Sequence, residues 1–148
     1  MRRRDFAYGM MGIATALVLA PLRVFAARPE GAFSANKMDA VLKAQFNSTQ
    51  LTESGDITIK APDIAENGAV VPVTVNFNVK GAETVSIIAE NNPNPLAASF
   101  TLTPDSGGSV STRIKMGKTS KVHAVVKAGG KLYSASKEVK VTIGGCGG

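Results

Sequence analysis

Val71-Pro72-Val73-Thr74-Val75-Asn76-Phe77-Asn78-Val79-Lys80 is the stretch that decides the fold class. Apolar residues occupy every second position in it, and polar residues or proline stand between them. Because successive side chains of a strand point to opposite faces of a sheet, this pattern predicts one long, half-buried strand. Proline has no backbone N–H to donate to a neighbouring strand, so we expect the start of this strand to lie at an edge or a bulge.

Shorter alternating segments follow this stretch, separated by turn-rich sequences, at residues 85–89, 98–102, 110–116, 122–126 and 132–143. Gly129-Gly130 stands between the last two and is typical of a two-residue hairpin turn. Short strands with a turn roughly every ten residues are typical of β-sandwiches. The sequence therefore predicts an all-β fold, an immunoglobulin-like β-sandwich over residues 55–143.

A helix is predicted in front of the sandwich, within residues 28–54. Its apolar residues recur at the spacing of a single helical face: Met38, Val41, Leu42 and Phe46. Ser34 is of a residue type that caps helix N-termini, and the polar triplet Asn47-Ser48-Thr49 is expected to end the helix.

Residues 1–27 have the layout of an export signal. Arginines precede an apolar stretch at residues 7–22, and small residues near Ala26 and Ala27 suit a cleavage site. Arg3-Arg4-Asp5-Phe6 fits the twin-arginine pattern. We therefore predict a twin-arginine signal peptide and a periplasmic protein that is not attached to the membrane once the signal is removed. A retained membrane anchor is the alternative.

Few residues are available for chemistry, because the sequence contains one histidine and one cysteine. This excludes a structural zinc site made of Cys and His and a disulfide framework within the chain. We expect His123 to be solvated on the wet face of a strand. The sequence around Lys118 resembles the end of a phosphate-binding loop, but Thr112 stands where that motif needs its first glycine. We predict no catalytic residue, no metal site and no cofactor.

Charge is distributed unevenly along the sequence. Residues 28–105 carry more acidic than basic side chains, whereas residues 106–148 carry many lysines and a single acidic residue, Glu138. This basic half could hold an anionic group or attract acidic partners, for example through Lys137 and Lys140. Lysines on the wet faces of strands are the simpler interpretation. Nucleic acid is a poor candidate partner, because only 5% of the residues are aromatic and the protein is expected to be exported.

The feature that carries chemistry is the ending Gly144-Gly145-Cys146-Gly147-Gly148, which holds the only thiol of the chain. Glycine loses the most backbone entropy on ordering, so we expect a flexible tail. Five fully extended residues span at most about 17 Å, which suits a swinging arm that presents Cys146 away from the sandwich. Nothing cationic lies within the tail, so partner enzymes would have to activate the thiol.

The signal, the segment Glu66-Asn67-Gly68-Ala69-Val70-Val71-Pro72-Val73-Thr74-Val75 and the glycine-cysteine ending together make the sequence resemble the SoxY family. These proteins are sulfur-carrier subunits of the periplasmic Sox system, which oxidises thiosulfate. The resemblance implies a heterodimer with SoxZ. It also implies that the cytochrome SoxAX joins Cys146 to thiosulfate as a cysteine S-thiosulfonate. The manganese hydrolase SoxB then releases sulfate, and the molybdenum–haem dehydrogenase SoxCD can oxidise the sulfane sulfur that remains.

Two other interpretations stay open at this point. The last residue, Gly148, could hold sulfur as a thiocarboxylate, as in ubiquitin-like sulfur carriers, which have a β-grasp fold and act in the cytoplasm. Alternatively, the domain could be a structural β-sandwich in which Cys146 joins two chains through a disulfide. Each predicts different sulfur chemistry at the C-terminus.

Overall fold

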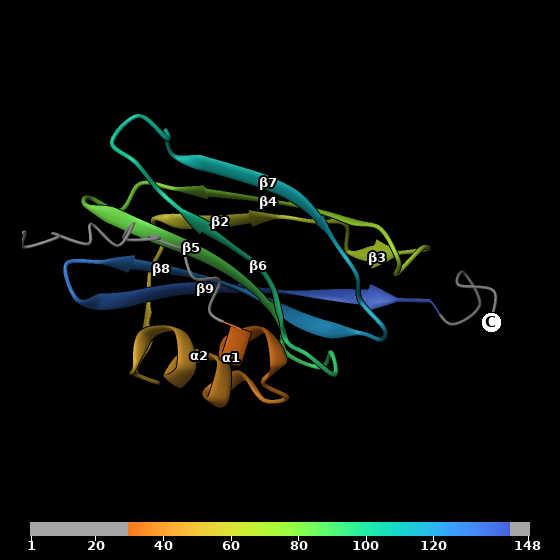
Figure 1. Cartoon of the computed structure of the whole chain (residues 1–148). Coiled ribbons are helices and arrows are strands. Elements are labelled where there is room, and N and C mark those ends of the chain that lie inside the picture. Colours follow the sequence, from red (N-terminus) through yellow and green to blue (C-terminus); the bar gives the residue numbers. More distant parts are fainter. Residues whose placement is uncertain (1–29, 143–148) are drawn as a thin grey trace, which may run out of the picture.

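The computed structural model of the chain describes residues 30–142. The predicted signal peptide, residues 1–27, and the predicted arm, residues 144–148, lie outside this part. Within it, strands dominate, two short helices come first, and the strands form two sheets. The prediction of an all-β sandwich preceded by an N-terminal helix is confirmed (Figure 1).

The two sheets differ in size. The larger sheet has the strand order β1-β9-β8-β5-β6, with β3 also paired to β9, and the smaller sheet has the order β2-β4-β7. Strand bounds in the larger sheet are Thr52–Glu53 (β1), Ile64–Ala65 (β3), Ala82–Ala89 (β5), Leu96–Thr101 (β6), Ser120–Ala128 (β8) and Lys131–Val141 (β9). Those in the smaller sheet are Ile57–Lys60 (β2), Val71–Phe77 (β4) and Ser109–Ile114 (β7).

Strand β4 behaves as its alternating sequence predicts. Its apolar residues are buried in the core between the sheets, and the residues between them are exposed or half-buried. Strand β4 is the central strand of its sheet, yet its pairing with β2 ends at Thr74. Pro72 is paired with β7 only, opposite Arg113. The expectation that this proline lies at an edge therefore holds for the first residues of a strand that is otherwise central.

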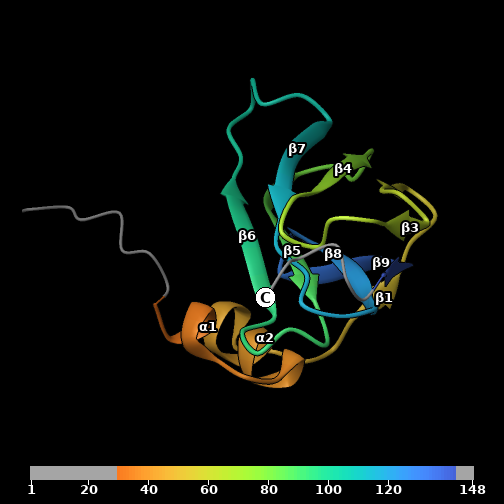
Figure 2. The same cartoon turned by 90° about the vertical axis from the view of Figure 1, so that its right-hand side faces the viewer.

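The larger sheet is covered on both faces. Helices α1 (Glu30–Ser34) and α2 (Met38–Phe46) pack on the face turned away from the smaller sheet, as the end-on view in Figure 2 shows. A second apolar cluster fills this layer, with Val41 and Leu42 of α2 against Ile88 and Val125 of the sheet. The fold therefore has three layers: helices, larger sheet and smaller sheet.

The start of the predicted helix differs from the expectation. Ser34 ends α1, and its hydroxyl donates to the carbonyl of Glu30, so it does not cap α2. Lys37 holds the cap position of α2 in an extended conformation, without a side-chain hydrogen bond. The polar triplet does end the helix, because Asn47 takes a left-handed conformation (φ 55°) and its N–H donates to the Lys43 carbonyl.

The hairpin between β8 and β9 is confirmed. Ala128 pairs with Lys131, so Gly129 and Gly130 alone form the turn, and both have positive φ, 57° and 76°. Two consecutive positive φ values are the signature of the turn type that favours glycine in such hairpins. From this turn β9 runs the length of the sandwich to the opposite end (Figure 1). Within residues 30–142, no helix is long and apolar enough to cross a membrane.

Candidate functional site

The candidate site is centred on the end of β9, which precedes the glycine-cysteine tail in the sequence. Cys146 and the glycines around it (Gly144, Gly145, Gly147 and Gly148) lie outside the described residues. The structure describes the chain up to Thr142, which directly follows β9. It therefore shows the surroundings of Val141 and Thr142, which we call the root of the tail.

The end of β9 is held from both sides. On one side, β3 runs parallel to it, with Ala65 opposite Val141, and the Thr142 N–H donates to the Ala65 carbonyl over 3.2 Å. On the other side, the Val141 N–H donates to the hydroxyl of Thr119 over 3.0 Å. The last described residues are therefore fixed by one main-chain and one side-chain acceptor, and the tail starts from a defined position.

A tight turn after β3 packs against this root. The Met116 N–H donates to the Gly68 carbonyl over 2.6 Å. A Cβ atom built at Gly68 would clash with the Met116 carbonyl oxygen and would lie 2.9 Å from Cγ1 of Val141. Backbone on one side and β9 on the other leave room for glycine only.

The loop between β7 and β8 also lies beside the end of β9, and asparagine side chains hold it by hydrogen bonds. The Asn92 side chain donates to the Lys115 carbonyl (2.6 Å) and accepts from the Gly117 N–H (3.2 Å). The Asn91 side chain donates to the Thr119 carbonyl (2.9 Å). These bonds fix the loop that carries Thr119, which in turn holds β9.

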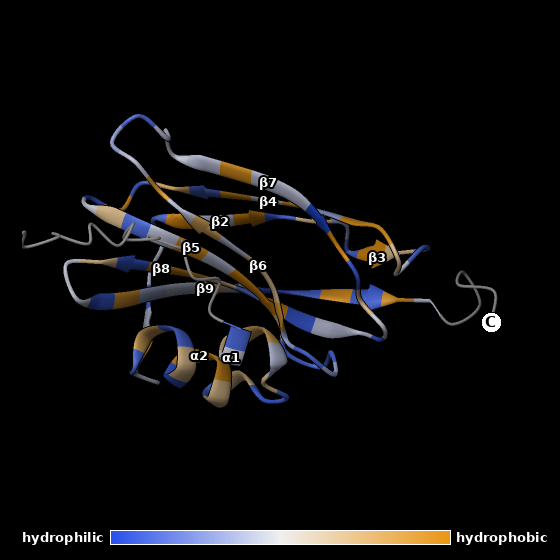
Figure 3. Ribbon diagram, in the orientation of Figure 1, coloured by the Kyte–Doolittle hydropathy of each residue, from blue (hydrophilic) through white to orange (hydrophobic). Residues whose placement is uncertain are grey.

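Apolar side chains are exposed around the root. Among residues 30–142, the exposed large hydrophobic residues are Ile64 (57% exposed) and Val70 (50% exposed). Both belong to the segment that runs through β3 and the following turn to β4, beside the end of β9. Figure 3 shows the hydrophobic colour on β3, beside the end of β9.

Two lysines, Lys118 and Lys140, are exposed on the same end. Neither forms an ion pair within the part of the chain that the structure describes. Lys137, which the sequence offered as a free cation, is engaged instead. Its ammonium group lies 3.1 Å from the Asp63 carboxylate and donates to the Ala61 carbonyl over 2.6 Å.

The expectation that His123 is solvated is wrong. Its side chain is 16% exposed, and Nε2 lies 3.0 Å from a carboxylate oxygen of Glu90. The outer face of β8 is crowded here, because Ile88 and Ser136 flank His123 on the two neighbouring strands and Glu90 reaches it from the end of β5. Across residues 30–142, no group of three or more His, Cys, Asp or Glu side chains could hold a metal ion.

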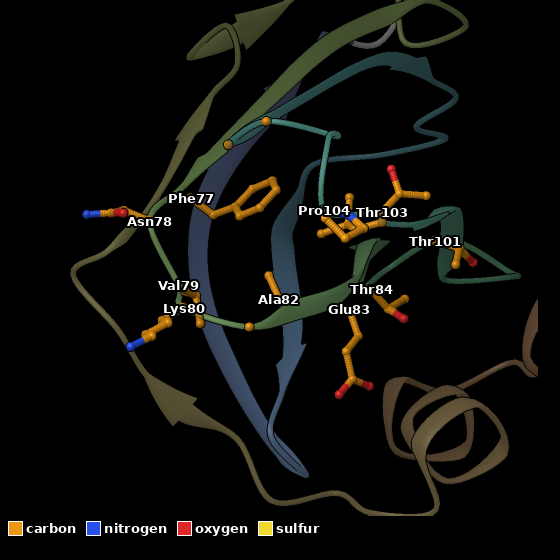
Figure 4. A pocket seen from close by; sticks show the side chains of 14 residues that line it. Phe77, Asn78, Val79, Lys80, Ala82, Glu83, Thr84, Thr101, Thr103 and Pro104 are labelled. Carbon is orange, nitrogen blue, oxygen red and sulfur yellow. The ribbon is translucent and has the colours of Figure 1, made fainter.

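A hollow of about 970 Å³ opens at the other end of the sandwich. Its lining comes from the β4–β5 connection and from the segment between β6 and β7. Figure 4 shows the Phe77 ring pointing into it, whereas Asn78 and Lys80 point away. Because β9 runs away from this end, the hollow is remote from the root of the tail (Figure 1).

The family model for the sulfur oxidation protein SoxY matches residues 42–146. The chain belongs to the SoxY family. The match covers all the described strands and extends through residue 146, the position of Cys146. The resemblance seen in the sequence is confirmed.

One solved structure agrees with the SoxY assignment. The sulfur carrier protein SoxY from Chlorobium limicola f thiosulfatophilum is 51% identical, with a TM-score of 0.66, and the match covers 76% of this chain and 97% of that chain. The superoxide reductase (neelaredoxin) from Ignicoccus hospitalis is 21% identical, with a TM-score of 0.50 and coverage of 58% and 80%. This second likeness shows a shared fold alone. No curated protein matches the chain.

The sequence indicated the glycine-cysteine tail but not the residues that surround the end of β9. The positions of Ile64, Val70 and Gly68 at the root depend on β3, whose two residues are too few to show any periodicity. Asn67-Gly68 is a pair typical of turns, but our sequence predictions include no turn there, and nothing in the sequence indicates that this segment packs on β9.

Proposed function

We propose that this protein carries sulfur covalently on Cys146 and presents it to partner enzymes during the oxidation of thiosulfate to sulfate. The observation that carries the proposal is that the SoxY family match extends through residue 146, the position of the only cysteine of the chain. The relative from Chlorobium is itself described as a sulfur carrier protein.

The fixed root supports a carrier role. Hydrogen bonds to the Ala65 carbonyl and to the Thr119 hydroxyl hold the end of β9, so the sandwich offers a rigid base. Four residues separate Thr142 from Cys146, and four extended residues span at most about 14 Å. In this proposal the flanking glycines (Gly144, Gly145, Gly147 and Gly148) make the arm flexible and narrow enough for the thiol to enter the active site of another protein.

The proposed chemistry follows from the thiol. When Cys146 is loaded, its sulfur forms a bond to the sulfane sulfur of thiosulfate, and one proton and two electrons leave to a cytochrome of the SoxAX type. The product is a cysteine S-thiosulfonate. Water then cleaves the bond between the sulfane sulfur and the sulfonate sulfur in a SoxB-type hydrolase, which releases sulfate and one proton and leaves a persulfide on Cys146.

The carrier itself is not the catalyst in this proposal. It acts in the periplasm after export by the twin-arginine signal at residues 1–27, followed by a helical segment (28–54), the sandwich (55–143) and the arm (144–148). SoxZ is its permanent partner, and SoxAX, SoxB and, where present, SoxCD bind it transiently. Loading, hydrolysis and further oxidation belong to these enzymes.

Mass spectrometry of the C-terminal peptide tests the proposal directly. In protein purified from cells grown on thiosulfate, we expect the peptide that contains Cys146 to carry the mass of one S₂O₃ group, which a thiol reductant removes. Cys146→Ser is the matched control, and we expect it to abolish the adduct and the oxidation of thiosulfate. A wild-type peptide that never carries sulfur would overturn the proposal.

The same spectrum separates the two other interpretations. A thiocarboxylate on Gly148 survives the reductant, and it belongs to a β-grasp fold, whereas the described residues form a two-sheet sandwich. A structural disulfide through Cys146 gives a covalent dimer on a non-reducing gel and no sulfur adduct.

A further inference from the structure

The smaller sheet has one uncovered face. Its strands turn alternate residues toward the core and the residues between them outward. Within residues 30–142, no helix or strand packs on this outer face, as Figure 1 and Figure 2 show. A shallow hollow of about 540 Å³ lies on it between β4 and β7. The hollow is lined by Pro72, Val73, Thr74, Ser111, Thr112 and Arg113.

Two hydroxyl groups lie side by side on this face. Thr74 and Ser111 are paired across β4 and β7, and their hydroxyl oxygens are 2.8 Å apart. In such a pair one hydroxyl donates to the other, and the accepting hydroxyl keeps its own hydrogen free for a third atom. An anion above the pair can therefore accept a hydrogen bond from one hydroxyl at once, and from both when the bond between them opens.

A positively charged side chain stands on each side of the hydroxyl pair. Lys60 is directly opposite Thr74 on β2, and Arg113 is two residues from Ser111 on β7. Both side chains are exposed. Directly opposite residues of a sheet have Cβ atoms about 5 Å apart, and diagonal neighbours about 7–8 Å apart. Both long side chains can therefore reach an anion that lies on the two hydroxyls.

The charges of these two cations are not compensated on the sheet. Strands β2, β4 and β7 contain no aspartate or glutamate. Neither Lys60 nor Arg113 forms an ion pair with another described residue. Of the acidic residues that flank β2, Asp56 precedes the far end of the strand and Asp63 is paired with Lys137. The outer face therefore has an uncompensated positive charge, which attracts anions.

Protection of the sheet edges explains these cations only in part. Strands β2 and β7 are the edge strands of their sheet, and a charged side chain on an edge strand discourages pairing with other molecules. The hydroxyl pair between the cations has no part in that, nor has the exposed Pro72 opposite Arg113. Together these residues suit a ligand with charged oxygens on one side and a weakly hydrated atom on the other.

The outer face also lies toward the end of the sandwich that carries the root of the tail. Pro72 and Arg113 are paired near the start of β4 and the end of β7. Met116, three residues after Arg113, donates its N–H to the carbonyl of Gly68, which packs on the end of β9. A ligand on this face is therefore held at the same end of the protein as the root.

Resting on the proposed carrier function, we infer that this face binds the thiosulfate dianion without a covalent bond, before it is joined to the carrier thiol. Its oxygens would accept from the two hydroxyls and pair with the two cations, and its terminal sulfur would lie against the Pro72 ring. Hydrogen bonds from charged donors are the stronger ones, and the planar guanidinium of arginine suits oxyanions. We call Lys60, Pro72, Thr74, Ser111 and Arg113 the oxyanion face.

The test uses the complex of the carrier with its SoxZ partner, with Cys146→Ser so that no covalent adduct can form. Thiosulfate is titrated at constant ionic strength while the amide and guanidinium signals are followed by nuclear magnetic resonance. Sulfate, which lacks the terminal sulfur, is titrated in the same way. Thr74→Val/Ser111→Ala removes the hydroxyls and keeps both charges, whereas Lys60→Gln/Arg113→Gln removes the charges and keeps the hydroxyls.

We expect thiosulfate to shift the signals of Thr74, Ser111 and Arg113 along one saturating curve and to bind several-fold more tightly than sulfate. Each double variant should weaken binding of thiosulfate about tenfold, because it removes charge-assisted hydrogen bonds. Lys80→Gln/Lys131→Gln, on exposed lysines at the opposite end of the sandwich, is the matched control and should bind thiosulfate as wild type does.

Three outcomes would overturn the inference. Unchanged affinity for thiosulfate in both double variants, or shifts spread evenly over all exposed lysines, would show that this face is not a site. Equal affinity for sulfate and thiosulfate would remove the assignment to thiosulfate. Binding to the carrier alone but not to the complex would assign the face to the SoxZ interface. Failure of the carrier proposal looks different, because the wild-type peptide with Cys146 would then carry no sulfur while the oxyanion face still bound thiosulfate.

Discussion

At the scale of the residue, Gly68 shows how closely the frame around the tail is packed. Its Cα faces the Met116 carbonyl on one side and the Val141 side chain on the other, with no space for a methyl group. Its own carbonyl accepts a hydrogen bond from Met116. One glycine thus lets the turn after β3, the β7–β8 loop and the end of β9 come together.

Gly68→Ala should therefore destabilise the protein by about 1–3 kcal/mol, the usual cost of forcing extra atoms into a packed site. The nearer obstacle is a backbone oxygen, which cannot rotate away as a side chain could. Urea unfolding measures the effect. Gly55→Ala is the control, because a Cβ there meets nothing within 4 Å, and its unfolding midpoint should stay close to wild type. Equal midpoints for the two variants would contradict the described packing.

Lys137 makes two contacts that contribute differently to the free energy of unfolding. Its bond to the Ala61 carbonyl joins a charged donor to the backbone in a half-buried place, whereas Asp63 is 90% exposed. Lys137→Met should lower the free energy of unfolding by about 1 kcal/mol. Asp63→Asn should change it little, because exposed ion pairs contribute little. Thermal unfolding of the two variants compares them, and a larger loss from Asp63→Asn would reverse this ranking.

At the scale of the element, β5 is buried on both faces. Its last five residues, Val85 to Ala89, are all buried, because the smaller sheet covers one face and the helices cover the other. Ile87 belongs to the cluster between the sheets and Ile88 to the cluster under the helices. A sandwich without the helical layer would leave Ile88 in water.

Ile87→Ala and Ile88→Ala should therefore destabilise the protein by similar amounts, about 2–5 kcal/mol each. Ile64→Ala is the matched control. The same side chain is removed there from a surface where it is 57% exposed, so the unfolding midpoint should hardly move. Chemical denaturation of the three variants is the measurement. A small effect of Ile88→Ala would mean that the helices do not pack on the sheet.

The strands that could be predicted from sequence are those long enough to show a period. Strand β4 was found from seven alternating residues and β8–β9 from a glycine pair between two alternating runs. Strands β1 and β3 have two residues each, which is too short for any pattern, and their place is set by pairing with β9. The contact of the half-buried His123 was missed for a related reason, since it depends on Glu90 at the end of another strand.

At the scale of the whole molecule, the sandwich has two unlike ends. One carries the root of the tail, framed by β3 and the β7–β8 loop. The other carries the β8–β9 turn and the hollow lined by Phe77 and its neighbours. If the carrier proposal holds, contacts with processing enzymes belong to the first end and the second is free of them.

Insertion of a short glycine-serine segment tests this polarity. Placed between Gly129 and Gly130, it should leave processing of sulfur on Cys146 close to wild type. Placed between Gly117 and Lys118, it should slow processing several-fold, because the added residues stand beside the end of β9. Loop extensions cost little stability, so both variants should fold. Sulfate release from the loaded complex is the readout, and equal rates would argue against a single functional end.

The candidate thiol can be recognised in the sequence alone, whereas the residues around the root of the tail cannot. A lone cysteine among four glycines is a local feature that needs no fold to be noticed. The residues that frame it come from 64–70 and 115–120, and they meet only because β3 pairs in parallel with β9. No periodicity encodes that pairing.

The outer edge of β9 is paired at only a few residues, and this has one more consequence. The strand has 11 residues, but β1 covers only Tyr133 and Ser134 and β3 only Lys140 and Val141, and between them Lys137 reaches across to the Ala61 carbonyl. A long unpaired strand edge can pair with a strand of another molecule. Short neighbouring strands with a lysine between them prevent such pairing. The strand that leads to Cys146 is thereby protected from pairing with other chains, so crowding should not lock this thiol away in an aggregate.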